Sequence, residues 1–220
     1  MDKDKIIIAL DVNTIKEEQR LLDILSPHVN IFKIGMELFY SCGAKAVELV
    51  KKYDREVFLD LKFHDIPNTV KNASKAAAKL GVFMFNVHAS GGSDMMKAAL
   101  EGAEEESEKM GIGKPKILGV TVLTSIESSQ DQVLNLARSA KESGIDGVVA
   151  SAQEAKAIRK KLGEDFLIVT PGIRPKDTEK QDQKRTATPQ EALQAGADYI
   201  IIGRPVTKAK DPKKVLEAMK

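Results

Sequence analysis

The sequence has little of several features that define common protein classes. Its 220 residues include one cysteine, Cys42, and no tryptophan. A single thiol excludes an internal disulfide, and no group of Cys and His residues has the spacing of a zinc site. The apolar run directly before Asp11 has only five residues, too few for a signal-peptide core or a membrane span. We therefore expect a cytoplasmic protein with no membrane partner.

An excess of charge of one sign is also absent. Lysine and arginine total 34 and aspartate and glutamate total 32, which leaves a formal net charge of +2. This balance argues against a surface that binds a polyanion, although a local basic pocket for one phosphate stays compatible with it. Nucleic acid is therefore not expected as a partner.

What the chain does contain is a regular alternation of two kinds of segment. Short apolar runs rich in β-branched residues, typical of parallel strands buried on both faces, alternate with longer amphipathic segments. The predicted strands are 6–10, 31–34, 57–61, 82–87, 117–123, 147–150, 167–170 and 199–202. The predicted helices are 15–25, 44–53, 70–80, 95–110, 133–143, 152–162, 191–195 and 215–219.

Residues at the helix ends agree with this division. Thr14 and Asp131 are suited to be helix N-caps, and Pro189 suits a first helical turn. Glycines follow four of the predicted helices, as expected of C-terminal stops. These are Gly81, Gly144, Gly163 and Gly196.

Eight strand–helix units predict an α/β fold, a closed (β/α)8 TIM barrel, as a single domain over residues 1–220. The alternative is a doubly wound open sheet. The dinucleotide-binding form of that sheet has a glycine-rich turn after the first strand, where this chain has Leu-Asp-Val-Asn at residues 10–13. The closed barrel is therefore favoured. The polar stretch 171–189 is long enough to act as a lid over a site.

Polar residues gather at the C-terminal ends of the predicted strands, where barrels of this kind build their active sites. They are Asp11, Lys33, Asp60, Lys62, His64, Asp65, Asn86, His88, Thr124, Ser125, residues 170–174, Gly203 and Arg204. Solvated surface charge would not concentrate at this end of the strands by chance. The sequence therefore predicts a site here.

Asp60 and Lys62 are two residues apart on one strand, so their side chains leave the same face and those of Leu59 and Leu61 leave the other. Lys33 comes from the adjacent strand, which would place two ammonium groups around one carboxylate. In a partly desolvated site such pairs are stronger than in water and pKa values shift. The alternative is a charge network that only seals the barrel.

Gly203 and Arg204 follow the eighth predicted strand, where such barrels commonly bind phosphate. The glycine lets the backbone approach an anion, and the guanidinium group can contact it in bidentate fashion. The sequence therefore predicts a phosphorylated small molecule as the ligand.

Residues 60–69 read DLKFHDIPNT, and this segment resembles the signature of the orotidine 5'-monophosphate decarboxylase family. The resemblance extends over the whole chain. It includes residues 9–11, 32–35, 121–125, 170–175 and 203–205. It implies a (β/α)8 barrel that converts orotidine 5'-monophosphate to uridine 5'-monophosphate and carbon dioxide, with no metal and no organic cofactor.

The resemblance also implies roles for individual residues around the reacting base. Lys62 would be the general acid that protonates C6 of the pyrimidine, and Asp60 would lie beside the scissile carboxylate. Lys33 would hold Asp60 and a ribose hydroxyl. Asp11 would bind the ribose, and Thr124 the edge of the pyrimidine.

Other implied roles lie further from the reacting base. Arg174 and Gln183 would belong to a closing loop, and Gly203 and Arg204 would bind the phosphate. By the same resemblance Asp65, together with Ile66 and Thr69, would reach into the active site of a partner subunit. A homodimer is therefore implied.

Three rival functions remain open. A magnesium-dependent sugar-phosphate decarboxylase or aldol synthase would require an acidic ligand where this chain has Lys33, and Glu37 is one helical step too far. A Schiff-base aldolase would use Lys62 as its nucleophile. A nucleotide-binding module would bind the monophosphate without turnover.

Overall fold

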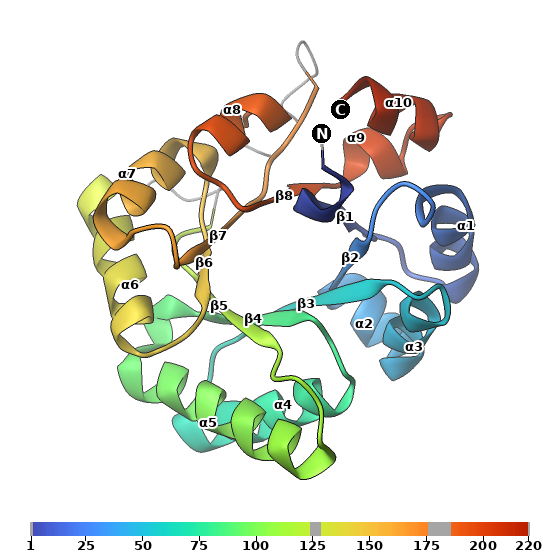
Figure 1. The fold of residues 1–220 in the computed structure, drawn as a ribbon. Coiled ribbons are helices and arrows are strands. Elements are labelled where there is room, and N and C mark those ends of the chain that lie inside the picture. The colour runs from blue at the N-terminus through green and yellow to red at the C-terminus, as the bar shows by residue number, and fades with distance from the viewer. Residues whose placement is uncertain (1, 124–128, 176–185, 220) are drawn as a thin grey trace.

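The structure is a computed structural model that describes residues 2–123, 129–175 and 186–219. Within these residues the strands form one closed, parallel barrel in chain order, and β8 pairs with β1 (Figure 1). The strands are Ile6–Ala9 (β1), Ile31–Gly35 (β2), Glu56–Phe63 (β3), Met84–His88 (β4), Lys116–Val120 (β5), Gly147–Val149 (β6), Leu167–Thr170 (β7) and Tyr199–Ile202 (β8). The predicted (β/α)8 barrel is confirmed.

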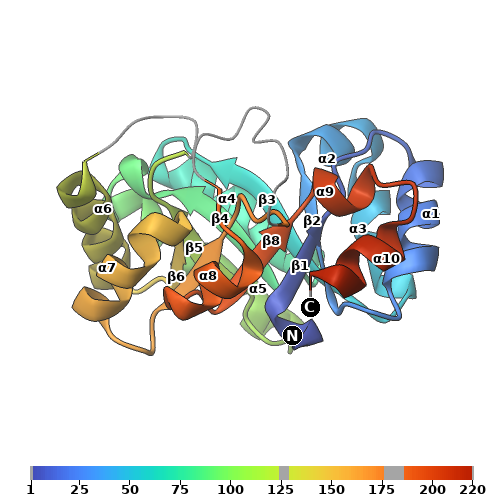
Figure 2. The ribbon, with the colours of Figure 1, turned by 90° about the horizontal axis from the view of Figure 1, so that it is seen from above.

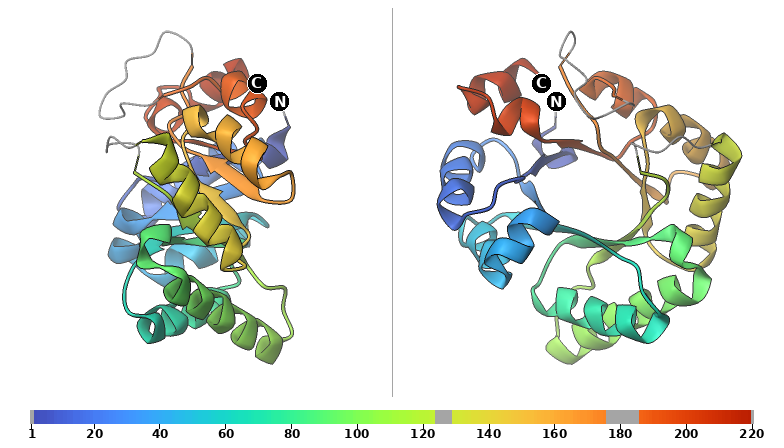
Figure 3. Two further views of the ribbon diagram at one scale, coloured as in Figure 1. Left: turned by 90° about the vertical axis from the view of Figure 1, so that its left-hand side faces the viewer. Right: turned by 180° about the vertical axis from the view of Figure 1, so that it is seen from behind.

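The helices form an outer layer around the strands in both end-on views (Figures 1 and 3). They are Ile15–Leu25 (α1), Met36–Cys42 (α2), Ala44–Lys52 (α3), Pro67–Lys79 (α4), Ser93–Met110 (α5), Gln130–Glu142 (α6), Ala152–Leu162 (α7), Pro189–Gln194 (α8), Arg204–Thr207 (α9) and Pro212–Ala218 (α10). Single 3-10 turns occur at Lys3–Lys5 and Ala89–Gly91. No helix in the described part of the chain is long and apolar enough to cross a membrane.

Two apolar layers follow from the alternation of side chains along each strand. One layer fills the barrel interior and the other lies between the strands and the helices, as expected for a barrel with a packed core. The interior layer consists of Ile7, Ala9, Ile31, Phe58, Met84, Leu118, Val169 and Ile201. On β3, Leu59 and Leu61 belong to the outer layer, so the predicted assignment of their face is confirmed.

Most predicted helix ends are confirmed, and one is wrong. The Thr14 hydroxyl accepts a hydrogen bond from the backbone N–H of Glu17 at 3.2 Å, and Pro189 begins α8. The N-cap of α6 is Ser129 instead of Asp131, which lies one residue inside the helix. Ser129 takes the cap because its hydroxyl accepts the backbone N–H of Gln132.

Two short helices, α2 and α9, were not predicted from the sequence, and β5 ends at Val120, three residues earlier than predicted. Each added helix directly follows a strand, so both begin at the end of the barrel where the strands finish. Figure 2 shows the two chain termini at the opposite end. The C-terminal ends of the strands therefore form a separate face, on which the polar residues lie.

Candidate active site

The barrel interior changes from apolar to charged toward the C-terminal ends of the strands. Ile31 on β2 and Phe58 on β3 face the interior layer. Because the side-chain direction repeats every two residues, Lys33 and Asp60 face the same interior one level higher. Both are nearly buried, with 8% and 9% of their surface exposed. The strand pattern thus carries two charged groups into the mouth of the barrel.

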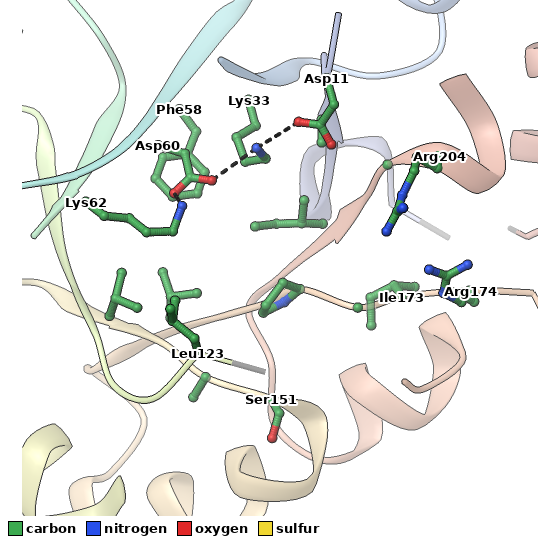
Figure 4. A pocket seen from close by; sticks show the side chains of 18 of the residues that line it. Asp11, Lys33, Phe58, Asp60, Lys62, Leu123, Ser151, Ile173, Arg174 and Arg204 are labelled. Atoms are coloured by element: carbon green, nitrogen blue, oxygen red, sulfur yellow. Dashed lines mark hydrogen bonds and ion pairs between the residues drawn. The ribbon is translucent and has the colours of Figure 1, made fainter. Parts of the chain in front are cut away.

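Four charged side chains meet at this level in a chain of ion pairs (Figure 4). The Lys33 Nζ atom lies 3.0 Å from Asp60 Oδ2 and 3.3 Å from Asp11 Oδ1. The Lys62 Nζ atom lies 2.8 Å from Asp60 Oδ1. Asp60 therefore has an ammonium group on each of its two carboxylate oxygens, an arrangement that the sequence predicted from the spacing along β3.

The protonation states follow from these pairs. Burial acts to raise the pKa of Asp60, but Lys33 and Lys62 outweigh it and lower this pKa to about 2. Burial likewise acts to lower the pKa of Lys33, but Asp60 and Asp11 raise it above its ordinary value. Near neutral pH Asp60 is therefore a carboxylate and Lys33 an ammonium ion.

Lys62 has a backbone conformation that few residues other than glycine adopt. Its φ angle is 53°, in the left-handed region, at a cost on the order of 1–2 kcal/mol. The ladder between β3 and β4 is interrupted here, since Leu59 pairs with Phe85 and the next pair is Phe63 with Val87. Strained backbone of this kind is typical of functional sites.

These groups line one side of a pocket of about 230 Å³ in the barrel mouth. Its floor is apolar, because the upper members of the interior layer lie beneath it. The lining residues are Ala9, Asp11, Lys33, Phe58, Asp60, Lys62, Val120, Val122, Leu123, Val149, Ala150, Ser151, Pro171, Gly172, Ile173, Arg174, Ile201, Gly203, Arg204 and Pro205.

Two arginines lie on the opposite side of the pocket from Lys62 (Figure 4). Arg174 follows β7 and is 5% exposed, and its backbone N–H donates to the carbonyl of Ala187 at 3.0 Å. Arg204 begins α9 directly after Gly203. A Cβ atom at Gly203 would lie 3.5 Å from the Asp11 carboxylate, so a side chain there would take up space in the pocket. One side of the pocket thus suits an anion.

Three predicted site residues do not line this pocket. Asp65, Ile66 and Thr69 lie where β3 leads into α4, and all three are exposed. The Asp65 carboxylate accepts the backbone N–H of Ile66 at 2.7 Å, and Ile66 is 67% exposed. This segment therefore lies at the surface, outside the pocket.

Two other predicted site residues, Thr124 and Gln183, lie outside the described residues. The same holds for residues 176–185 of the predicted lid 171–189. The described ends of that stretch meet in a bridge between Ile173 and Ala187. Arg174 is thus anchored at the pocket from one end of the stretch.

Sequence reasoning gave no role to three residues at the site. Asn86 on β4 is 1% exposed and bonds to both Asp60 and Lys62. A Cβ atom at Gly35 would lie 3.1 Å from Lys33 Nζ, so this glycine leaves room for the ammonium group. Ser151 lines the pocket at the start of α7. The available signals were the place of Asn86 among the polar residues at strand ends and the capping-box spacing of Ser151 with Glu154.

Two histidines stand beside the ion pairs but do not line the pocket. The rings of His64 and His88 lie with their centroids 5.3 Å apart. Burial lowers the pKa of His88, His64 and Lys62 lower it further, and Asp60 opposes them. His88 is therefore neutral near pH 7.

In the described part of the chain, no group of three or more His, Cys, Asp or Glu side chains is placed to hold a metal ion. The two carboxylates nearest each other in the pocket, Asp11 and Asp60, share the ammonium group of Lys33. A divalent cation at this position would have to displace that lysine.

Known proteins similar to this chain share its full length. A family model described as "Orotidine 5'-phosphate decarboxylase / HUMPS family" matches residues 4–219. A protein of Syntrophomonas wolfei named orotidine 5'-phosphate decarboxylase is 49% identical over 223 residues, covering 96% of this chain and 93% of the relative. A protein of the same name from Trichlorobacter lovleyi is 51% identical over 228 residues, covering 98% and 93%.

A solved structure also has a fold similar to that of this chain. The crystal structure of orotidine 5'-phosphate decarboxylase from Lactobacillus acidophilus superposes with a TM-score of 0.86 at 42% sequence identity. The match covers 98% of this chain and 97% of that one. Sequence and structure therefore lead to the same group of proteins.

Proposed function

Because the chain belongs to the orotidine 5'-phosphate decarboxylase / HUMPS family, we propose that it is a carboxy-lyase that converts orotidine 5'-monophosphate to uridine 5'-monophosphate and carbon dioxide in pyrimidine biosynthesis. The observation that carries this function is the Lys33–Asp60–Lys62 array along one side of an open pocket. The names of the relatives favour decarboxylation over the other activity in the family description.

In the proposed reaction the bond between C6 and the carboxylate carbon breaks, and its electron pair stays on C6. Lys62 gives a proton from Nζ to C6, and solvent later returns a proton to the amine. The ion pair of Lys62 with Asp60 supports this role, because it holds the Lys62 ammonium group at the side of the pocket before substrate binds. No metal and no organic cofactor take part in this proposal.

The charges of Asp60 and the two lysines supply the rate enhancement in this scheme. The Asp60 pKa of about 2 keeps this group ionised, so a substrate carboxylate held beside it meets a like charge in a pocket with an apolar floor. That repulsion falls as the carboxylate becomes neutral carbon dioxide. Lys62 and Lys33 meanwhile stabilise the negative charge that develops at C6, so binding is stronger in the transition state than in the ground state.

The rest of the nucleotide is assigned to the remaining pocket residues. Asp11 and Lys33 would bind ribose hydroxyls, and Gly203 and Arg204 would bind the phosphate. Support comes from the placement of the guanidinium groups of Arg174 and Arg204 across the pocket from Lys62. Thr124 is assigned to the pyrimidine edge, and Arg174 with Gln183 to a loop that closes over the nucleotide. Binding energy from the phosphate would then drive closure.

We further propose that a homodimer completes each site, with Asp65, Ile66 and Thr69 reaching into the pocket of the partner subunit. Their exposure, and their position outside the pocket of their own subunit, support this assignment. We also propose that the chain is one domain and acts in the cytoplasm.

The deciding experiment follows the ultraviolet absorbance of orotidine 5'-monophosphate with excess chelator present. We expect full turnover in the wild type, and a loss of several powers of ten in Lys62→Ala with unchanged circular dichroism. Turnover that requires a divalent metal would support the sugar-phosphate rival.

Two other outcomes would support the remaining rivals. Borohydride trapping of substrate on Lys62 would identify a Schiff-base aldolase. Tight binding of the nucleotide without release of carbon dioxide would identify a binding module. Near-wild-type turnover in Lys62→Ala would overturn the assignment of the proton donor.

A further inference from the structure

Asn86 lies on β4 beside the ion pairs, and both ends of its amide group are bonded to them. Its Nδ2 atom donates to Asp60 Oδ1 at 2.7 Å. Its Oδ1 atom accepts the backbone N–H of Lys62 at 2.8 Å. With 1% of its surface exposed, Asn86 exchanges neither bond readily for water. One side chain thus contacts both the carboxylate and the lysine of the proposed reaction.

The need for this side chain arises from the interruption between β3 and β4. From one ladder pair to the next, β3 advances from Leu59 to Phe63 while β4 advances only from Phe85 to Val87. Three residues of β3 therefore lie opposite Asn86 alone. The Lys62 N–H therefore has no partner in the regular ladder, and an N–H shielded from water without an acceptor is destabilising. The Asn86 carbonyl oxygen takes the place of the missing ladder acceptor.

From this geometry we infer that Asn86 is a positioning residue, which holds the Lys62 backbone in its left-handed conformation and fixes the orientation of the Asp60 carboxylate. It does so before substrate arrives. The consequence for the reaction rests on the proposed function, since it is Lys62 that would deliver the proton. The positioning itself does not rest on it.

An amide is the group that suits this place. It supplies one donor and one acceptor without charge, as the N–H of Lys62 and the carboxylate of Asp60 require. An aspartate at residue 86 could accept from Lys62, but when ionised it would repel Asp60. When protonated, its O–H could donate to Asp60 and restore both bonds. A leucine fills a similar volume and makes neither bond.

In Asn86→Asp the positioning of Lys62 and Asp60, and with it kcat, should therefore depend on pH. The ionisable groups that would face the new carboxyl are Asp60 and Lys62 on β3, Lys33 on β2, His88 on β4 and His64 beyond β3. On the other side Asn86 pairs with Leu118 of β5, which carries no charge. Because residue 86 is buried and its side chain lies 2.7 Å from an Asp60 carboxylate oxygen, we expect the introduced carboxyl group to titrate above an ordinary aspartate.

The experiment compares wild type, Asn86→Asp, Asn86→Leu and the control Thr121→Val. Thr121 directly follows β5, and its hydroxyl donates to the carbonyl of Val149 at 3.0 Å, so this control loses a comparable hydrogen bond that does not involve the ion pairs. The rate constant kcat for nucleotide loss is measured against pH, and the Kd of uridine 5'-monophosphate is measured by calorimetry. Unfolding in urea reports the stability of each variant.

We expect Asn86→Leu to lower kcat roughly 100-fold, the effect of displacing a reacting group by about 1 Å, with a Kd within about threefold of wild type. In Asn86→Asp, kcat should fall as far at high pH and rise again as the pH is lowered. In Asn86→Leu, kcat should stay low over the same pH range. Thr121→Val should keep wild-type kcat. A loss in Asn86→Leu no larger than in the control, or a pH profile of Asn86→Asp parallel to that of wild type, would overturn the inference.

A crystal structure of Asn86→Leu tests the positioning without reference to turnover. We expect the Lys62 φ angle to leave 53° and the contact between Lys62 Nζ and Asp60 to lengthen beyond 2.8 Å. Unchanged geometry there would defeat the inference whatever reaction the protein catalyses. Wild type that does not consume the nucleotide, with the expected displacement in the variant, would instead refute the proposed function alone.

Discussion

Glu18 is a buried carboxyl group that works against the stability of the barrel. It lies on the same face of α1 as Leu21, Leu22 and Leu25, and all four side chains are fully buried. Neither of its carboxylate oxygens has a hydrogen-bond partner among the described residues. A carboxylate in this position would lose its hydration without compensation, so the folded protein favours the protonated acid.

The cost of this burial can be worked out from the pKa. Burial raises the pKa of Glu18 from 4.5 to about 8. Below the lower value both states hold the proton and there is no penalty. Between the two values only the unfolded chain releases it, so folding becomes less favourable by about 1.4 kcal/mol per pH unit. At neutral pH the penalty reaches about 3 kcal/mol.

We therefore predict that Glu18→Gln, which cannot ionise, gains stability relative to wild type as the pH rises. Urea unfolding between about pH 5 and pH 8 should show the difference in unfolding free energy growing in favour of the variant by roughly 1 kcal/mol per unit. Glu48→Gln on α3 is the matched control, because Glu48 is exposed on a neighbouring helix. Its difference from wild type should be nearly flat.

The test is the slope of the difference in unfolding free energy against pH. The absolute difference is less informative, because a glutamine also leaves a buried amide, which shifts the unfolding free energy by a constant at every pH. A difference between Glu18→Gln and wild type that does not change with pH would refute the reasoning, because it would mean that Glu18 titrates alike in both states. A falling difference would mean that the folded protein stabilises the carboxylate.

Three further changes have expected outcomes. Gly35→Ala should lower kcat/KM about 3- to 10-fold, because the new Cβ atom would crowd Lys33 Nζ. Its stability should change little, because the φ angle of −90° at residue 35 suits alanine. Michaelis kinetics and urea unfolding measure the two effects. Arg204→Ala should weaken nucleotide binding by about 2–5 kcal/mol and leave nucleoside binding unchanged, which calorimetry with both ligands measures. Arg159→Ala should destabilise the fold by about 2–4 kcal/mol in urea and spare kcat, since this side chain, which lies away from the pocket, is buried among polar acceptors. Those acceptors are Gly163, Glu164, Phe166, Gly196 and Asp198.

The barrel was predictable because parallel strands buried on both faces leave a continuous apolar run in the sequence. Eight such runs, each followed by an amphipathic segment, correspond to the eight strands of the closed sheet. Helices α2 and α9 escaped prediction because they span only Met36–Cys42 and Arg204–Thr207. Segments so short contain too few turns for a periodic pattern, and their form is set by the strands they follow.

The meeting of Asp60 and Lys62 was predicted from the two-residue period, but the structure achieves it by a less regular route. The Lys62 backbone is left-handed, and residues 60–62 fall between two successive ladder pairs with β4. The sequence of β3 by itself does not indicate this interruption of the ladder, because the interruption depends on the register between β3 and β4. The role of Asn86 was unpredictable for the same reason, since its two bonds exist only once the register breaks opposite it.

The charges of the pocket explain why a third carboxylate should be reactive there. Two carboxylates, Asp11 and Asp60, already face two ammonium groups, Lys33 and Lys62, so the array is balanced before a ligand binds. A further carboxylate beside Asp60 therefore adds one negative charge in excess. The two ammonium groups cannot fully compensate it, because they are already paired with Asp11 and Asp60. The arginines across the pocket can bind the phosphate of the same ligand, and this contact can keep the carboxylate beside Asp60. In the proposed reaction, release of carbon dioxide would remove the excess, and transfer of the Lys62 proton would then neutralise the charge left on carbon.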